Sequence, residues 1–149
     1  MDLLKVLLVS MLPVAECRLA IPLGVLTYDL PVWIVYIVAV IGNLLPVPLI
    51  VLFGGRVLEF MAEFKKLGAP FRWIIKHGEH KAAKIRGALF VGLLTFVAIP
   101  LPGTGAWTGA LIAITLRMRL RECMPAIGLG VIIAAAIMTF GSGAFSVLT

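Results

Sequence analysis

Residues 6–28 read VLLVSMLPVAECRLAIPLGVLTY, and two opposite charges, Glu16 and Arg18, stand in the middle of this otherwise apolar stretch. Ten uncharged residues precede Glu16 and ten follow Arg18. An ionisable group at membrane depth costs about 2.5–3.5 kcal/mol on insertion scales, so it usually pairs with another group inside a helix bundle. Pro13 and Pro22 flank the pair, and proline interrupts a regular helix. The pattern therefore predicts a broken helix in a membrane, with an ion pair near the break.

The composition of the whole chain indicates an integral membrane protein of one domain. Of its 149 residues, 62% are hydrophobic and 13% are charged, and the mean hydropathy is +1.13. Uncharged runs cover residues 30–55, 87–116 and 123–149, and each exceeds the roughly 20 residues that span a bilayer. The apolar N-terminal stretch meets Pro13 and Glu16 rather than a cleavage site, so we expect it to belong to the mature fold.

The positions of the basic residues that give the net charge of +6 indicate how the chain is oriented in a membrane. Eight of the 13 Lys and Arg residues lie in the segment 54–87, and three more, Arg117, Arg119 and Arg121, crowd one short loop. Basic residues near membrane ends mark the cytoplasmic side. We therefore expect residues 54–87 and 117–122 to share the cytoplasmic face of a cell membrane, and we expect no nucleic-acid partner.

This charge pattern favours two re-entrant hairpins over four simple spanning helices. With four spans, the arginine loop would lie on the side opposite residues 54–87, against the positive-inside rule. A straight helix over residues 87–116 would also be about 45 Å long, against a hydrocarbon core of about 30 Å. Residues 99–105, IPLPGTG, break that run in its middle with Pro and Gly. We therefore predict hairpins that enter and leave the membrane on the same side.

The predicted fold is a single all-α membrane domain (1–149) that forms an inverted repeat, 1–53 and 88–149. Each half combines a Pro-broken re-entrant hairpin with a transmembrane helix, and an amphipathic basic segment joins the halves. The predicted segments are, in order, hairpin 1–28, transmembrane helix 30–53, connector 54–87, hairpin 88–116 and transmembrane helix 123–146. Inverted repeats whose broken helices meet near the midplane are typical of secondary transporters. Two spanning helices enclose two hairpins poorly, so we expect at least a homodimer.

The candidate site residues are those that the hairpin turns and one spanning helix would bring to the midplane. They are Pro13, Glu16, Arg18, Asn43, Pro102, Gly103, Thr104, Gly105 and Trp107. Half-helices that start after a turn aim N–H groups at the membrane centre, and Arg offers a planar cation for carboxylate or phosphate. A buried carboxyl group such as that of Glu16 also suits proton exchange. Tight helix packing explains the Gly/Thr stretch equally well, and a structural ion pair is the alternative to a functional one.

Three motifs also carry a resemblance to a known family. ECRLAIPLG (16–24), GNLLPVP (42–48) and IPLPGTGAWTGALIA (99–113) resemble the small multidrug export protein family of small prokaryotic membrane proteins. The resemblance spans nearly the whole chain and implies export. More distantly, the paired hairpins are similar to DedA-type membrane proteins, for which translocation of a lipid carrier is proposed. Gly105 and Trp107 stand where we would expect charges in relatives of that type.

Two classes of function are compatible with these residues. The first is a secondary transporter or exporter of a small amphiphilic or lipid-like substrate, either passive or coupled to protons through Glu16. The second is a non-transporting membrane scaffold or assembly protein in which Glu16 and Arg18 form a structural ion pair. The sequence carries no Ser/His/Asp set, Walker loop or paired-carboxylate centre, so we expect neither an enzyme nor a bound metal or cofactor. The expected partners are the lipid bilayer, a second copy of the chain and the substrate.

Overall fold

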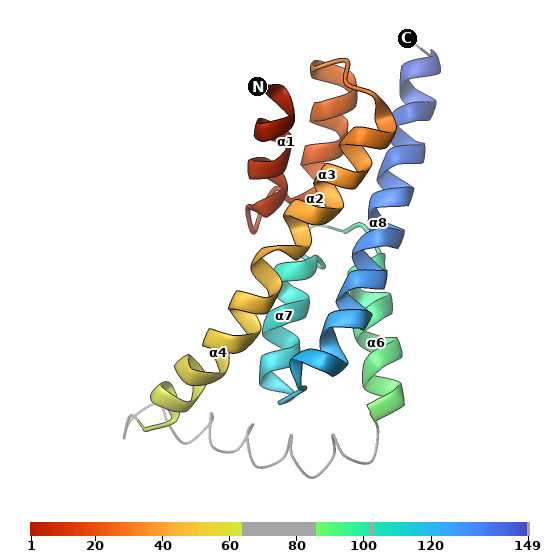
Figure 1. Cartoon of the computed structure of the whole chain (residues 1–149). Helices are drawn as coiled ribbons and strands as arrows, with labels where there is room; N and C mark the ends of the chain where they lie inside the picture. Colours follow the sequence, from red (N-terminus) through yellow and green to blue (C-terminus); the bar gives the residue numbers. More distant parts are fainter. Residues whose placement is uncertain (64–85, 102, 149) are drawn as a thin grey trace.

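The computed structural model describes residues 1–63, 86–101 and 103–148 (Figure 1). Every regular element within these ranges is helical, which confirms the predicted all-α class. Most of the predicted connector 54–87 lies outside the described residues, and so does Pro102.

Two long apolar helices run along the molecule, as the sequence predicts. The first consists of α3 (Val32–Leu44) and α4 (Pro46–Glu63), which are joined through Leu45 in helical conformation. The second is α8 (Leu120–Leu148). By length and composition, the 25 residues Val32–Arg56 and the 23 residues Leu120–Ser142 are able to cross a membrane. At 1.5 Å per residue they measure about 37 and 35 Å, against a hydrocarbon core of about 30 Å.

The ends of these helices differ from the ends of the apolar runs. α4 continues ten residues beyond position 53, where the connector was expected to begin, and α8 starts three residues before position 123. Residues 54–63, GGRVLEFMAE, include several good helix formers, so nothing in them stops the helix at the end of the apolar run. Between α3 and α4, Pro46 and Pro48 lack the N–H groups that would continue the hydrogen-bond ladder, which explains the interruption at Leu45.

Four shorter helices in the described ranges form two antiparallel pairs beside the long ones. α1 (Asp2–Met11) packs against α2 (Glu16–Pro22), which continues into the π-helical turn η1 (Leu23–Thr27). α6 (Arg86–Ala98) packs against α7 (Ala106–Thr115). A helix of ten residues is about 15 Å long, half the thickness of a hydrocarbon core. Each pair therefore extends only partway along the long helices (Figure 1).

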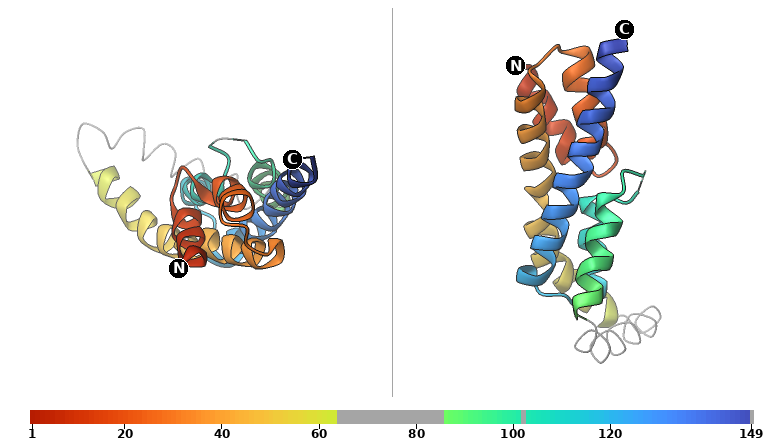
Figure 2. Two further views of the ribbon diagram at one scale, coloured as in Figure 1. Left: turned by 90° about the horizontal axis from the view of Figure 1, so that it is seen from above. Right: turned by 90° about the vertical axis from the view of Figure 1, so that its right-hand side faces the viewer.

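The two pairs approach the middle of the molecule from opposite ends. α1 and α2 pack against α3 and α8 at the end that carries both termini, whereas α6 and α7 pack against α8 and α4 at the other end (Figures 1 and 2). The two turns meet where hydrogen bonds join α2 to the segment between α6 and α7. This arrangement is compatible with two inverted hairpins, but their re-entry into a membrane stays a prediction.

Small residues let the short helices approach the long ones closely. A Cβ on Gly42 of α3 would overlap Ser10 Oγ of α1, and a Cβ on Gly130 of α8 would lie 2.7 Å from Val97 Cβ of α6. Such small residues at helix contacts are common in membrane proteins, where close van der Waals packing holds helices together. The glycines thus allow each hairpin to pack closely against its long helix.

Large apolar side chains point outward from the long helices. Trp33, Ile37, Leu52, Ile133 and Phe140 each expose at least two fifths of their surface. Water disfavours such a surface, whereas lipid chains are as apolar as these side chains and accept it. The outer surface of the molecule therefore suits a bilayer.

Candidate functional site

Glu16 and Arg18 lie where the two hairpin turns meet. Both belong to the first turn of α2; Glu16 is 3% exposed and the side chain of Arg18 is 12% exposed. Arg18 Nη1 donates a hydrogen bond to Oε2 of Glu16. The two side chains therefore form an ion pair that is shielded from bulk water.

The carboxylate of Glu16 caps the N-terminus of α7, a helix of the other hairpin. Oε1 accepts a long hydrogen bond of 3.5 Å from the backbone N–H of Trp107, in the first turn of α7. The first N–H groups of a helix lack intrahelical acceptors and carry the positive end of its dipole, so a carboxylate is favourable there. Gly105 makes the contact possible, because a Cβ at this position would overlap the carboxylate.

Arg18 reaches across to the turn that precedes α7. Its Nη2 donates to Thr104 Oγ1 at 2.9 Å and to the carbonyl oxygen of Ile99 at 3.2 Å. The Thr104 hydroxyl donates in turn to the carbonyl of Ile99, at 2.6 Å, or of Leu101, at 2.9 Å. Ile99 follows the last residue of α6, where carbonyl groups lack intrahelical donors. The guanidinium group therefore ties α2 to the end of α6.

Trp107 makes a contact in the opposite direction. Its indole Nε1–H donates a 3.0 Å hydrogen bond to the carbonyl oxygen of Met11, the last residue of α1. Side chains of each hairpin thus satisfy free helix ends of the other. In a soluble protein, water would hydrogen-bond the free N–H and C=O groups at these helix ends, but lipid chains cannot.

Two residues at this contact have left-handed backbone conformations. Gly103 has a φ of +86°, and Glu16 has a φ of +49°. Glycine adopts this region readily, whereas a residue with a Cβ does so at a cost of about 1–2 kcal/mol. Strain of this kind persists only where the surrounding contacts over-determine the conformation. The bonds from Glu16 to Arg18 and α7 are such contacts.

Of the nine predicted site residues, Pro102 lies outside the described chain and Gly103 lies in the turn before α7, and the other seven fall into two groups. Five of them join in one contact: Glu16, Arg18, Thr104, Gly105 and Trp107. Pro13 is exposed in the first turn, and Asn43 is buried on α3, outside the contact. Asn43 Oδ1 and Arg18 Nε are buried without a hydrogen-bond partner in the described part of the chain.

The backbone partners of this contact were missed by the sequence analysis. They are the carbonyl groups of Met11 and Ile99, which accept from Trp107 and Arg18. The last carbonyl groups of any helix lack partners, so the predicted break after α6 is a signal that could have found Ile99. No side-chain pattern distinguishes Met11.

The chemistry available here is proton exchange on a carboxyl group and hydrogen bonding to an anion. Among the described residues, no group of three His, Cys, Asp or Glu side chains could hold a metal ion. Cys17 and Cys123 are both buried and form no disulfide.

The helices and their apolar surfaces define a small all-helical integral membrane protein. Over residues 16–137 the chain matches the family model described as "Putative small multi-drug export protein". Because this match covers most of the chain, the protein belongs to that family, which confirms the resemblance of its motifs. The family is described by export and not by an enzymatic reaction. No curated protein and no solved structure matches the chain, and the resemblance to DedA-type proteins stays a prediction.

Proposed function

We propose that this protein is a secondary transporter of small amphiphilic molecules and that its substrate site is the contact around Glu16 and Arg18. The observation that carries the proposal is the position of the buried ion pair, at the junction of two half-length hairpins between two candidate membrane spans. Ionisable groups inside membrane segments are costly and usually mark substrate or proton pathways. Broken helices that meet near the midplane are also the layout of secondary transporters.

The proposed topology places the two hairpins on opposite sides of the membrane. α1 and α2 enter and leave from the side of the two termini, and α6 and α7 from the cytoplasmic side. Two features support this orientation. α4 ends at the same end of the molecule as the α7–α8 turn (Figure 1), and this end carries Arg117 and Arg119 of the turn and Arg121 of the first turn of α8. Basic residues favour the cytoplasmic side.

The contact suits a competition between the carboxylate of Glu16 and an acceptor group of the substrate. The ionised carboxylate occupies Arg18 and the N-terminus of α7, and both are good partners for anions. A proton on Glu16 weakens its hold on these donors, which then become available to a carboxylate, phosphate or carbonyl group. Arg18 Nε, which has no partner among the described residues, adds another donor. Binding of substrate would thereby be linked to the protonation of Glu16.

Transport by purified protein in liposomes tests this proposal. The liposomes contain a pH-sensitive dye, and the probes are fluorescent amphiphiles that are cationic, zwitterionic or anionic. We expect wild type to move at least one probe together with protons. Glu16→Gln should abolish the proton flux that accompanies the probe, and Arg18→Lys should raise the KM for an anionic probe, because a point charge replaces a planar fork of donors.

Lys5→Gln is the matched control, because Lys5 forms an exposed ion pair with Asp2 on the same hairpin. This variant should transport like wild type. If Glu16→Gln and Arg18→Lys fold and transport like the control, the contact is not the substrate site. If wild type transports nothing and both variants lose assembly instead, the protein is a scaffold with a structural ion pair.

A further inference from the structure

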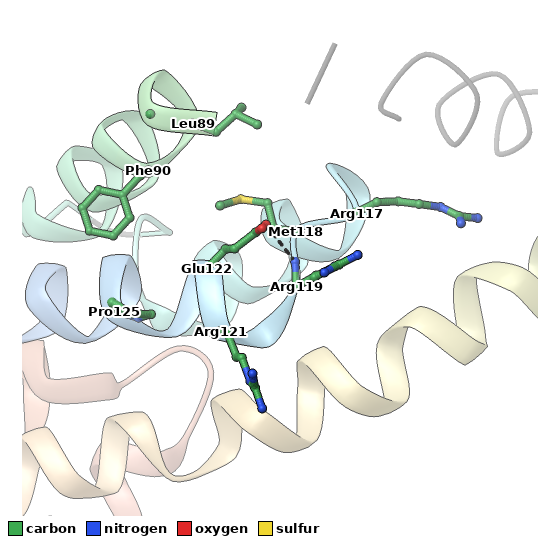
Figure 3. Close-up of a pocket in the computed structure, with 9 residues that line it drawn as sticks. Leu89, Phe90, Arg117, Met118, Arg119, Arg121, Glu122 and Pro125 are labelled. Carbon is green, nitrogen blue, oxygen red and sulfur yellow. Dashed lines mark hydrogen bonds between the residues drawn. The ribbon is translucent and has the colours of Figure 1, made fainter. Parts of the chain in front are cut away.

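A cavity of about 350 Å³ lies at the N-terminal end of α8 (Figure 3). It is formed by the first turns of α6, the turn between α7 and α8, and the first turns of α8. One wall is apolar and includes Leu89, Phe90 and Met118, and the rim carries Arg117, Arg119 and Arg121. Its volume falls in the range of about 300–1,000 Å³ that is typical of small-molecule sites.

We propose that this cavity binds the phosphate headgroup of an anionic lipid. The shared chemistry is a phosphate group beside an apolar body: the arginines would hold the phosphate, and the apolar wall would contact the glycerol and upper chain. Arginine suits phosphate because its planar fork donates two parallel hydrogen bonds. Basic pockets between membrane helices are known to hold lipid headgroups. This inference does not depend on the proposed transport function.

The charge balance of the cavity favours an anion. Three guanidinium groups and one carboxylate, that of Glu122, line it, which leaves a net charge of +2. Glu122 Oε2 accepts a 3.3 Å hydrogen bond from the backbone N–H of Arg119 (the dashed line in Figure 3), so this carboxylate caps the N-terminus of α8. In Figure 3 the side chains of Arg117 and Arg121 extend outward from the rim. Exposed side chains change rotamer within nanoseconds and can therefore turn towards a ligand.

Arg117 supplies a second, independent observation. Its φ is +50°, in the left-handed region, and it ends α7 as the residue after the C-cap. The N–H of Met118 bonds to the carbonyl of Ala113 at 2.9 Å, which is the hydrogen bond of a Schellman motif. Glycine is the usual residue at this position because it has no steric cost there. An arginine in its place opposes the local preference, and such outliers are found where function requires the side chain.

The position of the cavity along α8 fits a lipid headgroup. The candidate span of α8 begins at Leu120, between two of the rim arginines. The cavity therefore lies at the boundary of the apolar segment, the depth at which phosphate groups of a bilayer are found.

Native mass spectrometry of the full chain in detergent, titrated with phosphatidylglycerol or phosphatidylcholine, tests the proposal. We expect wild type to retain phosphatidylglycerol preferentially, and each of Arg117→Gly and Arg119→Gln to weaken that binding by about fivefold. Arg117→Gly also relieves the left-handed backbone, so the melting temperature of each variant without lipid is measured beside its lipid binding. A loss of binding at an unchanged melting temperature then reports the guanidinium group and not misfolding.

Arg56→Gln is the control, because Arg56 is an exposed arginine of α4 that does not line the cavity. The proposal is overturned if Arg56→Gln weakens phosphatidylglycerol binding as much as Arg117→Gly, since binding would then report only overall charge. It is also overturned if inorganic phosphate alone competes at the same concentration as the lipid, because the site would then take a free anion. Equal retention of the two lipids by wild type has the same consequence.

Discussion

Removing one member of the Glu16–Arg18 pair should destabilise the protein almost as much as, or more than, removing both. The variants that test this are Glu16→Gln, Arg18→Met and their combination. Glutamine keeps the shape of glutamate, and methionine replaces the arginine stem with an apolar chain. All three variants fill the space of the original side chains, so the measured losses report charge and hydrogen bonds rather than a cavity.

The expected losses follow from the bonds that each variant leaves unsatisfied. In Glu16→Gln, the largely buried guanidinium of Arg18 loses its counter-ion, which costs about 3–5 kcal/mol for a broken buried pair. In Arg18→Met, the carboxylate still caps α7, and a helix N-terminus recovers up to about 2 kcal/mol for a partly buried anion. We therefore expect a smaller loss for this variant, about 2–4 kcal/mol. The double variant buries no charge and should lose no more than about 4 kcal/mol, well below the sum of the singles.

Reversible unfolding in bicelles by steric trapping measures these free energies directly. The intrinsic fluorescence of the chain, to which Trp107 next to the pair contributes together with Trp33 and Trp73, gives a second readout of the same transition. Lys5→Gln serves as the control, because its pair with Asp2 has a normal length of 2.8 Å but is about half exposed. Exposed pairs contribute little to stability, so this variant should unfold like wild type.

Additive losses would refute the reasoning, because they would mean that the two side chains do not share one buried contact. A larger loss for Arg18→Met than for Glu16→Gln would refute the capping of α7 by Glu16. Either result would also remove the physical basis for competition between this carboxylate and a substrate.

Three further outcomes are expected. Gly105→Ala should cost about 1–3 kcal/mol in thermal unfolding, because its Cβ would overlap the Glu16 carboxylate, whereas Gly92→Ala has open space and should not destabilise. A single cysteine at position 119 should react with an impermeant thiol reagent only from the cytoplasmic side, and a single cysteine at position 29 only from the outside. Labelling of position 119 in intact cells would contradict the re-entrant hairpins. Val14 in the first turn is 89% exposed, and lipid cannot form hydrogen bonds to the backbone groups of an uncovered turn, so we expect a second copy of the chain to cover it. Cross-linking through position 14 in native membranes should therefore give a dimer. Recovery of a monomer alone would contradict this.

Hydropathy and proline content were sufficient to predict the helical class and the two breaks. Pro13 and Pro100 lie in turns of the described chain, and the long apolar runs became α3–α4 and α8. The end of α4 at Glu63 could not be read from hydropathy, because a helix ends where its backbone bonds end, not where its side chains become polar. The hydropathy of side chains therefore predicts where a helix leaves the membrane better than it predicts where the helix ends.

The contacts of the candidate site were predictable only in part. A buried charge needs partners, so electrostatics alone indicates that Glu16 and Arg18 lie against polar groups, and in the structure these are Thr104 and the start of α7. The bond from Trp107 to Met11 had no such basis, because the sequence does not indicate which free carbonyl group at the end of α1 the indole would reach. The aim of the Glu16 carboxylate at α7 also depends on a left-handed φ that a sequence does not indicate for glutamate.

The two hairpins are held together because each supplies hydrogen-bond partners to the free helix ends of the other, inside the molecule. Each hairpin alone leaves helix ends whose N–H and C=O groups lipid cannot satisfy. Glu16 serves the start of α7, Arg18 the end of α6, and Trp107 the end of α1. Because these three bonds lie in one contact, separating the hairpins exposes all three ends together. If the protein transports as proposed, water or a polar substrate replaces the caps when the hairpins separate, and the closed ion pair is then also the point at which the pathway opens.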